Sequence, residues 1–116
     1  MRVLLIEDEF LVATAVEAVL DSMGCEVVGP AATVEAALSL LSDGEAPDVA
    51  IVDLNLRGEP SEPVALELDR RHIPFVFATG YDVDDDLSAR FPAAQWLRKP
   101  YTDQQIRASL MEIMNV

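Results

Sequence analysis

The sequence predicts a three-layer α/β sandwich, in which helices cover both faces of a parallel β-sheet. Short apolar runs alternate regularly with segments of helical periodicity along the chain. The apolar runs are continuous, which is typical of strands that are buried on both faces of a parallel sheet. A chain of 116 residues is long enough for one hydrophobic core and too short for two. We therefore expect a single domain over residues 1–116.

Five strands are predicted from these apolar runs and from the turn residues that follow them. They cover residues 2–6, 25–28, 48–54, 75–78 and 95–97. The Gly29-Pro30 pair is expected to close the second strand. Glu26 places a charge within that strand, which indicates a position at the edge of the sheet.

The segments between the strands carry helical signals. A first helix is predicted over residues 10–23, where Gly24 is placed to end it. Its buried face is expected to contain Leu11, Val12, Ala15, Val16, Val19 and Leu20. A second helix is expected between the capping residue Thr33 and Gly44, and a third over residues 62–72.

The last part of the chain predicts one weak helix and one well-defined helix. Residues 82–92 are acidic, contain few good helix formers and end at Pro92, so we expect a short or mobile fourth helix there. Thr102 and Gln105 have the spacing of a capping box at the start of the fifth helix. Its buried face is expected to contain Ile106, Leu110, Ile113 and Met114.

The composition restricts the compartment and the partners. The chain carries 21 acidic and 8 basic residues, a net charge of −13, which disfavours nucleic acids and anionic membranes and favours cations and basic protein surfaces. A single cysteine, Cys25, fits a reducing compartment, and no apolar run approaches the roughly 18 residues that span a bilayer. We expect a cytoplasmic protein.

Because the chain begins at its first strand and ends on its last helix, we expect it to lack an output domain.

Charged residues follow three of the predicted strands. Glu7 and Asp8 follow the first, Asp53 stands at the end of the third, and Lys99 follows the last. All strands of a parallel sheet end at the same edge, so these side chains are expected to converge there. The repulsion between neighbouring carboxylates favours a bound cation, and hard oxygen ligands select Mg²⁺ or Ca²⁺. Mg²⁺ fits better, because it keeps several waters and takes one or two carboxylates together with a phosphate oxygen.

Lys99 and Thr79 suit this pocket to phosphoryl chemistry. Lys99 is a counter-ion for an added phosphoryl group, and Thr79 supplies a hydroxyl donor at the end of the fourth strand. A nucleophilic carboxylate beside a metal ion, a hydroxyl and an ammonium group is suited to forming an acyl phosphate.

With these residues in register, the chain resembles the receiver domain of bacterial two-component response regulators along its whole length. The resemblance implies that Glu7 and Asp8 are the acidic pair that binds Mg²⁺ and that Asp53 accepts the phosphoryl group. It also implies roles for four further residues. Asn55 would bind the metal through its backbone carbonyl, the Thr79 hydroxyl and the Trp96 ring would switch, and Lys99, which precedes Pro100, would bind the phosphoryl group. Glu7 replaces the more usual aspartate, and its extra methylene favours metal contact through a water.

The same resemblance implies a fold and a reaction. The fold is the flavodoxin-like sandwich, with five parallel strands in the order 2-1-3-4-5 and five helices. Such a domain takes its phosphoryl group from the phosphohistidine of a sensor histidine kinase or a phosphotransfer protein. It catalyses only its own phosphorylation and dephosphorylation, and it signals through altered partner binding or phosphorelay. We expect a monomer or a weak dimer.

A narrower resemblance rests on the run Pro-Phe-Val-Phe-Ala-Thr-Gly-Tyr at residues 74–81. It is similar to the FATGUY group of receivers, which are often single-domain and associated with kinases of the HWE/HisKA2 type. Tyr81, at the end of this run, is expected to gate the site, although it could also be a plain loop aromatic. Trp96 could likewise be a half-buried core residue without a switching role.

Three other functions remain open. An aspartate-nucleophile phosphatase uses similar chemistry, but it normally has a second aspartate two residues beyond the nucleophile, where this chain has Asn55. A flavodoxin-type cofactor binder would need a phosphate-binding loop after the first strand, where Glu7, Asp8 and Glu9 would repel a phosphate. The chain could also be a receiver fragment of a larger regulator.

Overall fold

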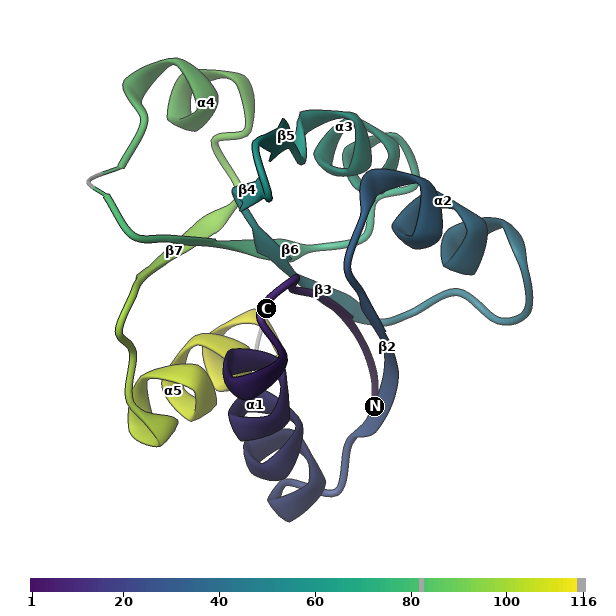
Figure 1. Ribbon diagram of the computed structural model, residues 1–116, viewed down its shortest axis with the longest axis vertical. Coiled ribbons are helices and arrows are strands. Elements are labelled where there is room, and N and C mark those ends of the chain that lie inside the picture. Colours follow the sequence, from purple (N-terminus) through teal and green to yellow (C-terminus); the bar gives the residue numbers. More distant parts are fainter. Residues whose placement is uncertain (82, 115–116) are drawn as a thin grey trace.

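A five-stranded parallel sheet forms the centre of the computed structural model, which describes residues 1–81 and 83–114 (Figure 1). Its strands are β1 (Arg2–Ile6), β2 (Glu26–Ala31), β3 (Val49–Asp53), β6 (Phe75–Thr79) and β7 (Gln95–Arg98). They lie side by side in the order β2-β1-β3-β6-β7, which is 2-1-3-4-5 when the strands of this sheet are counted along the chain. The predicted fold class and strand order are therefore confirmed. Glu26 lies on an edge strand, as expected, and its carboxylate pairs with Arg2 at 2.8 Å.

Helices cover both faces of the sheet (Figure 1), and on each face they pack over a cluster of buried apolar side chains, so the expected single core is divided into two halves by the sheet. The helices α1 (Phe10–Ser22) and α5 (Asp103–Met114) lie on one face, and α2 (Val34–Ser42), α3 (Glu62–Arg70) and α4 (Asp85–Arg90) lie on the other. Alternate residues of β1 enter different cores: Val3 and Leu5 pack with α1 and α5, whereas Leu4 and Ile6 pack with α2 and α3. This burial on both faces explains why the strands are apolar throughout. Among the described residues, no helix has the length and apolar character needed to cross a bilayer.

The predicted starts of the second and fifth helices are confirmed by their capping contacts, whereas α3 ends at Arg70, two residues earlier than predicted. Thr33 accepts a hydrogen bond from the amide of Ala36 at the start of α2. Thr102 and Gln105 exchange reciprocal bonds of 2.8 and 3.1 Å before α5. The fourth helix is indeed short: α4 has six residues and none of them is buried. Ile106 and Leu110 are buried on α5 as predicted, and the side chain of Met114 lies outside the described residues.

The end of the second strand was placed wrongly by the sequence pattern. The strand does not close at Gly29-Pro30 but continues to Ala31, because its pairing with β1 shifts register between Leu4 and Ile6. Gly29 has a φ of +101°, and a Cβ there would lie 2.7 Å from the carbonyl oxygen of Leu5. The glycine therefore allows the chain to pass through an irregularity of the sheet rather than to leave it.

The buried face of α1 also differs from the predicted one. Val16, Val19 and Leu20 are buried as predicted, but Leu11 and Ala15 are exposed, Val12 is half-buried, and Ala13 is buried instead. The helix begins with three consecutive apolar residues, and Phe10 and Leu11 among them are both solvent-exposed. A helix that is apolar on several sides does not define its orientation by periodicity alone, and packing against the sheet decides it.

A small hairpin directly after β3 was not predicted. Its strands, β4 (Asn55–Leu56) and β5 (Glu59–Pro60), pair antiparallel around Arg57 and Gly58. These two residues have φ values of 54° and 87°, the left-handed backbone that a tight two-residue hairpin turn requires. The side-chain oxygen of Asn55 accepts a hydrogen bond of 2.6 Å from the amide of Gly58 and so closes the turn.

Candidate functional site

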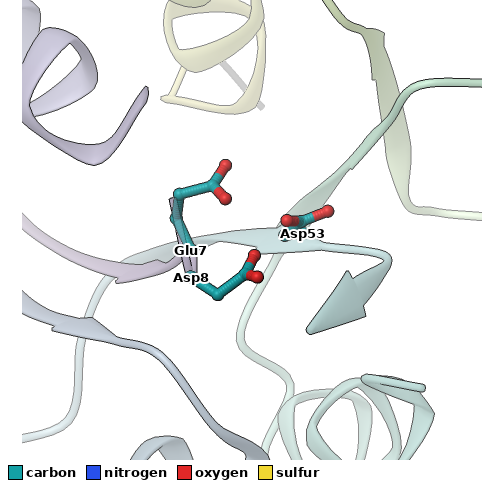
Figure 2. A group of neighbouring side chains, drawn as sticks. All are labelled: Glu7, Asp8 and Asp53. Atoms are coloured by element: carbon teal, nitrogen blue, oxygen red, sulfur yellow. The ribbon is translucent and has the colours of Figure 1, made fainter. Parts of the chain in front are cut away.

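Three carboxylates meet at the carboxyl edge of the sheet (Figure 2). Glu7 and Asp8 follow β1, and Asp53 ends β3, which is hydrogen-bonded to β1. Each residue offers an oxygen atom, and these oxygens lie within 4.8 Å of one another. Glu7 and Asp53 are buried, with exposed fractions of 3% and 6%. Buried like charges at this spacing repel strongly, so the cluster has the charge and the oxygen donors of a divalent cation site.

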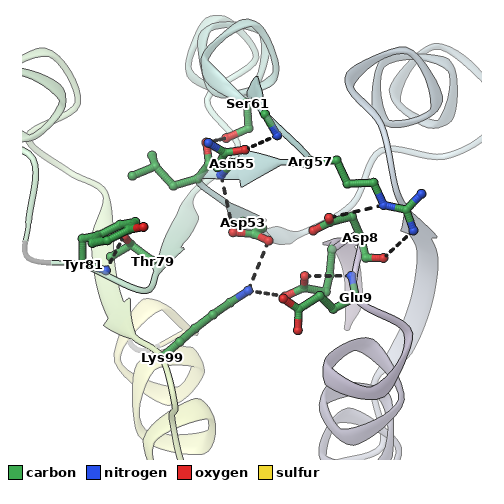
Figure 3. Close-up of polar contacts among 12 residues, drawn as sticks. Asp8, Glu9, Asp53, Asn55, Arg57, Ser61, Thr79, Tyr81 and Lys99 are labelled. Carbon is green, nitrogen blue, oxygen red and sulfur yellow. Dashed lines mark hydrogen bonds and ion pairs between the residues drawn. The ribbon is translucent and has the colours of Figure 1, made fainter.

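Lys99 reaches this cluster from the loop after β7 (Figure 3). Its Nζ lies 2.9 Å from Glu7 Oε1 and 3.1 Å from Asp53 Oδ2. Its backbone amide donates to the carbonyl of Thr79 at 2.6 Å, which ties the loop to the end of β6. Burial alone would lower the pKa of Lys99, but its bond to Glu7 and the charge of Asp53 raise that pKa overall. The ammonium group is therefore held charged between the two buried carboxylates.

The surroundings of Asp53 change its acidity. Burial raises the pKa of Asp53 from 3.8 to about 7, the neighbouring Glu7 carboxyl contributes to the rise, and Lys99 works against it. A carboxyl with a raised pKa in the folded protein binds its proton more tightly there than in the unfolded chain. The folded state therefore loses stability as the pH rises from about 4 through 7. The negative charge of Asp53 is thus destabilised by its surroundings, and a bound cation would stabilise it.

Asp53→Asn is consequently expected to stabilise the fold at neutral and alkaline pH. In EDTA at about pH 8 we expect a gain of about 2 kcal/mol in the free energy of unfolding, which shrinks as the pH falls towards 4. Urea unfolding of both proteins across this pH range measures the difference. A gain that is independent of pH, or a loss of stability at pH 8, would contradict the proposed origin of the effect.

Thr79 and Asn55 flank Asp53 on the two sides of the site (Figure 3). Thr79 is buried at the end of β6, and its Oγ1 accepts a bond of 3.1 Å from the amide of Tyr81. Asn55 donates its backbone N–H to Asp53 Oδ1 at 3.4 Å. The structure therefore brings Glu7, Asp8, Asp53, Asn55, Thr79 and Lys99 to one edge of the sheet.

The two aromatic residues with predicted roles, Tyr81 and Trp96, lie in different surroundings. The Tyr81 ring is largely exposed, although its backbone binds Thr79. Trp96 is half-buried on β7 and packs on Phe77, with ring centroids 4.9 Å apart. Its indole N–H is buried and has no hydrogen-bond partner among the described residues. A buried donor without a partner is rare, and it makes this ring a candidate for movement.

Two site residues were missed by sequence reasoning, and both belong to the hairpin region. Arg57 lies with its Nε 3.5 Å from Asp8 Oδ2. Ser61 is fully buried, and its hydroxyl donates to the carbonyl of Leu54 at 3.1 Å, which fixes the return of the hairpin (Figure 3). Their position in the sequence could have indicated them, because residues that follow Asp53 so closely must stay near the same edge of the sheet.

Known proteins of similar sequence and structure cover nearly the whole chain. SdrG from Sphingomonas melonis Fr1, a solution structure, is 41% identical over 98% of this chain and 96% of its own, with a TM-score of 0.83. The sensory transduction protein LytT from Bacillus subtilis (strain 168) is 29% identical over 119 residues, 100% of this chain and 49% of LytT. The phyllosphere-induced regulator PhyR from Methylorubrum extorquens is 27% identical over 97% of this chain and 43% of PhyR.

The family follows from a match along the chain itself. This chain spans about half the length of the curated relatives it matches, so LytT and PhyR compare only through the shared part. The model of the family described as response regulator receiver domain matches residues 3–111. The chain therefore belongs to the response regulator receiver domain family.

Proposed function

We propose that this receiver domain accepts a phosphoryl group on Asp53 in a Mg²⁺-dependent reaction. The observation that carries the proposal is the placement of Asp53: a buried carboxylate that contacts the Lys99 ammonium at 3.1 Å and lies within 4.8 Å of two further carboxylates. The donor would be the phosphohistidine of a sensor histidine kinase or of a phosphotransfer protein. Membership of the response regulator family supports this choice of donor.

The donor set of the site fits a magnesium ion. Asp8, Asp53 and the backbone carbonyl of Asn55 would hold it, together with Glu7. Both carboxylate oxygens of Glu7 already have partners, Lys99 at 2.9 Å and the amide of Glu9 at 3.1 Å, which favours its contact through a water. When bound, the ion would neutralise charge between the carboxylates and an incoming phosphoryl group.

The chain's own residues would carry the transfer. An Asp53 oxygen forms the new bond to phosphorus while the bond from phosphorus to the donor's imidazole nitrogen breaks, and the imidazole leaves with the electron pair. The Lys99 ammonium donates hydrogen bonds to one phosphoryl oxygen. The Thr79 hydroxyl, whose oxygen accepts from Tyr81 before transfer, donates to another.

The signal would arise from local movement around Thr79. As its hydroxyl turns to the phosphoryl group, space is released for the half-buried Trp96 ring, and the exposed Tyr81 gates the site. The unpartnered indole N–H of Trp96 supports the idea that this ring has a second favourable position. Such a shift changes the surface of α4, β7 and α5, where a partner would bind.

Acetyl phosphate tests the reaction without knowledge of the kinase. The chain is incubated with acetyl phosphate in MgCl₂ or in EDTA, and its intact mass is measured. We expect the mass of one phosphoryl group to be gained only in MgCl₂, and peptide mapping to place it on Asp53. Label that accumulates equally in EDTA would refute the Mg²⁺ dependence. Steady hydrolysis of small phosphomonoesters would favour the phosphatase alternative instead.

We further infer a stand-alone, cytoplasmic receiver of the FATGUY group, monomeric or weakly dimeric, phosphorylated by an HWE/HisKA2-type kinase. The run at residues 74–81 supports the assignment to the FATGUY group. The 41% identity to SdrG, which extends over 96% of that chain, supports a stand-alone receiver, because SdrG is a relative of similar size. Pull-downs with the beryllofluoride-treated and the untreated chain distinguish the outputs. Partners bound only by the treated form indicate signalling through binding, whereas equal capture in both states argues against a phosphorylation switch.

A further inference from the structure

Arg57 brings a second cationic side chain to the carboxylate cluster. Its Nε lies 3.5 Å from Asp8 Oδ2, and its Nη2 donates to the backbone carbonyl of Asp8 at 3.3 Å (Figure 3). The two residues are 49 positions apart in the chain, so the contact depends on the fold and not on local sequence. The cationic partners are therefore divided: Lys99 contacts Glu7 and Asp53, and Arg57 contacts Asp8.

The backbone holds Arg57 in place for this contact. It has a φ of +54°, a left-handed conformation that arginine rarely adopts, at the tip of the β4–β5 hairpin. The hairpin is anchored at its base by the buried Ser61 and by Glu59, whose Oε1 accepts from the amide of Val34 at 3.3 Å. The hairpin therefore holds Arg57 in a strained conformation at the edge of the site, as is common for residues with a functional role.

The two cations differ in how firmly they are held. The Lys99 side chain is 21% exposed and has two carboxylate partners, whereas the Arg57 side chain is 75% exposed and, among the residues that the structure describes, pairs with the single carboxylate of Asp8. An exposed ion pair of this kind is weak and is screened by salt. Breaking the pair between Arg57 and Asp8 therefore costs little free energy, whereas separating Lys99 from its two carboxylate partners costs more.

We propose that Arg57 competes with a divalent cation for Asp8 and thereby sets the metal affinity of the site. The Asp8 carboxylate cannot give its full charge to the guanidinium and to a metal ion at once, so each weakens the binding of the other. Arg57 would be an exchangeable counter-ion that keeps the affinity for the metal moderate. This inference rests on the proposed Mg²⁺-dependent function and concerns a residue outside the proposed metal ligands.

Arg57→Asn isolates the charge from the backbone. Asparagine adopts the left-handed conformation readily and is favoured in this type of turn, so the hairpin is kept while the guanidinium is removed. We expect the dissociation constant for Mg²⁺ to fall by about two- to five-fold, and the effect to shrink at high ionic strength. Arg70→Gln is the matched control, because Arg70 is an exposed arginine on α3 that pairs with Glu67 and not with the cluster.

Calorimetric titration of each purified protein with MgCl₂ provides the test. Tighter binding by Arg57→Asn, with Arg70→Gln unchanged, supports the proposal, and so does a larger rise of its melting temperature on adding MgCl₂. Unchanged or weaker binding by Arg57→Asn would overturn it, and weaker binding would make Arg57 a positioning residue for Asp8. If Asp8→Asn loses binding while Arg57→Asn behaves as wild type, only this inference fails. A wild-type chain that binds no Mg²⁺ would overturn the proposed function as well.

Discussion

Asp53→Asn is expected to take up no phosphoryl group from acetyl phosphate under conditions in which the wild-type chain takes up one. An amide is not a nucleophile towards phosphorus, so the acceptor itself is lost. The neighbouring carboxylates do not replace it: Glu7 is engaged by Lys99 and Glu9, and Asp8 faces Arg57. Intact-mass measurement after incubation in MgCl₂ gives the result directly.

The control for this variant is the same chemical change away from the site. Asp21 lies in the last turn of α1, shortly before β2 begins at Glu26 beside the first residue of β1, which is the edge of the sheet opposite the cluster, so Asp21→Asn should be labelled like the wild type. Unfolding does not account for a loss of label, because Asp53→Asn is expected to be the more stable protein at neutral pH. Label retained by Asp53→Asn would show that the acceptor is another residue.

Most of the fold and the centre of the site follow from a few local features. The strands are recognisable because each is apolar on both faces, and β1 and β3 enter both cores, as such strands must. The convergence of Glu7, Asp8, Asp53 and Lys99 then follows from topology alone, since parallel strands end at one edge. Neither inference requires the details of packing.

The features that sequence reasoning missed depend on tertiary contacts. The passage of β2 through Gly29 depends on the close approach of Leu5, a residue on another strand. The orientation of α1 depends on which side the sheet accepts, because Leu11 is as apolar as the residues that are buried. Arg57 is a turn residue in the sequence, and only the hairpin geometry brings its guanidinium to Asp8. The raised pKa of Asp53 likewise arises from burial beside Glu7, which a linear pattern does not contain.

Lys99→Met is expected to destabilise the fold by about 2–3 kcal/mol at neutral pH in EDTA. Methionine keeps much of the length and the apolar character of the lysine stem, so the change mainly removes the ammonium group. Glu7 and Asp53 are then left as two buried carboxylates without the cation that contacts both of them, at 2.9 and 3.1 Å. Removing one partner of a buried ion pair is costly because the remaining charge stays desolvated.

A double-mutant cycle with Asp53→Asn tests this explanation. In the Asp53→Asn background Lys99 still pairs with Glu7 but no longer with a charge at position 53. The loss of unfolding free energy caused by Lys99→Met should therefore be smaller by at least about 1 kcal/mol. The loss should also be smaller at about pH 5, where the carboxyl with the raised pKa binds a proton, than at pH 8. Urea unfolding of the four proteins at both pH values measures these differences. An equal loss in both backgrounds would mean that the Asp53 charge does not contribute, and that Lys99 stabilises the fold through Glu7 or through its packing.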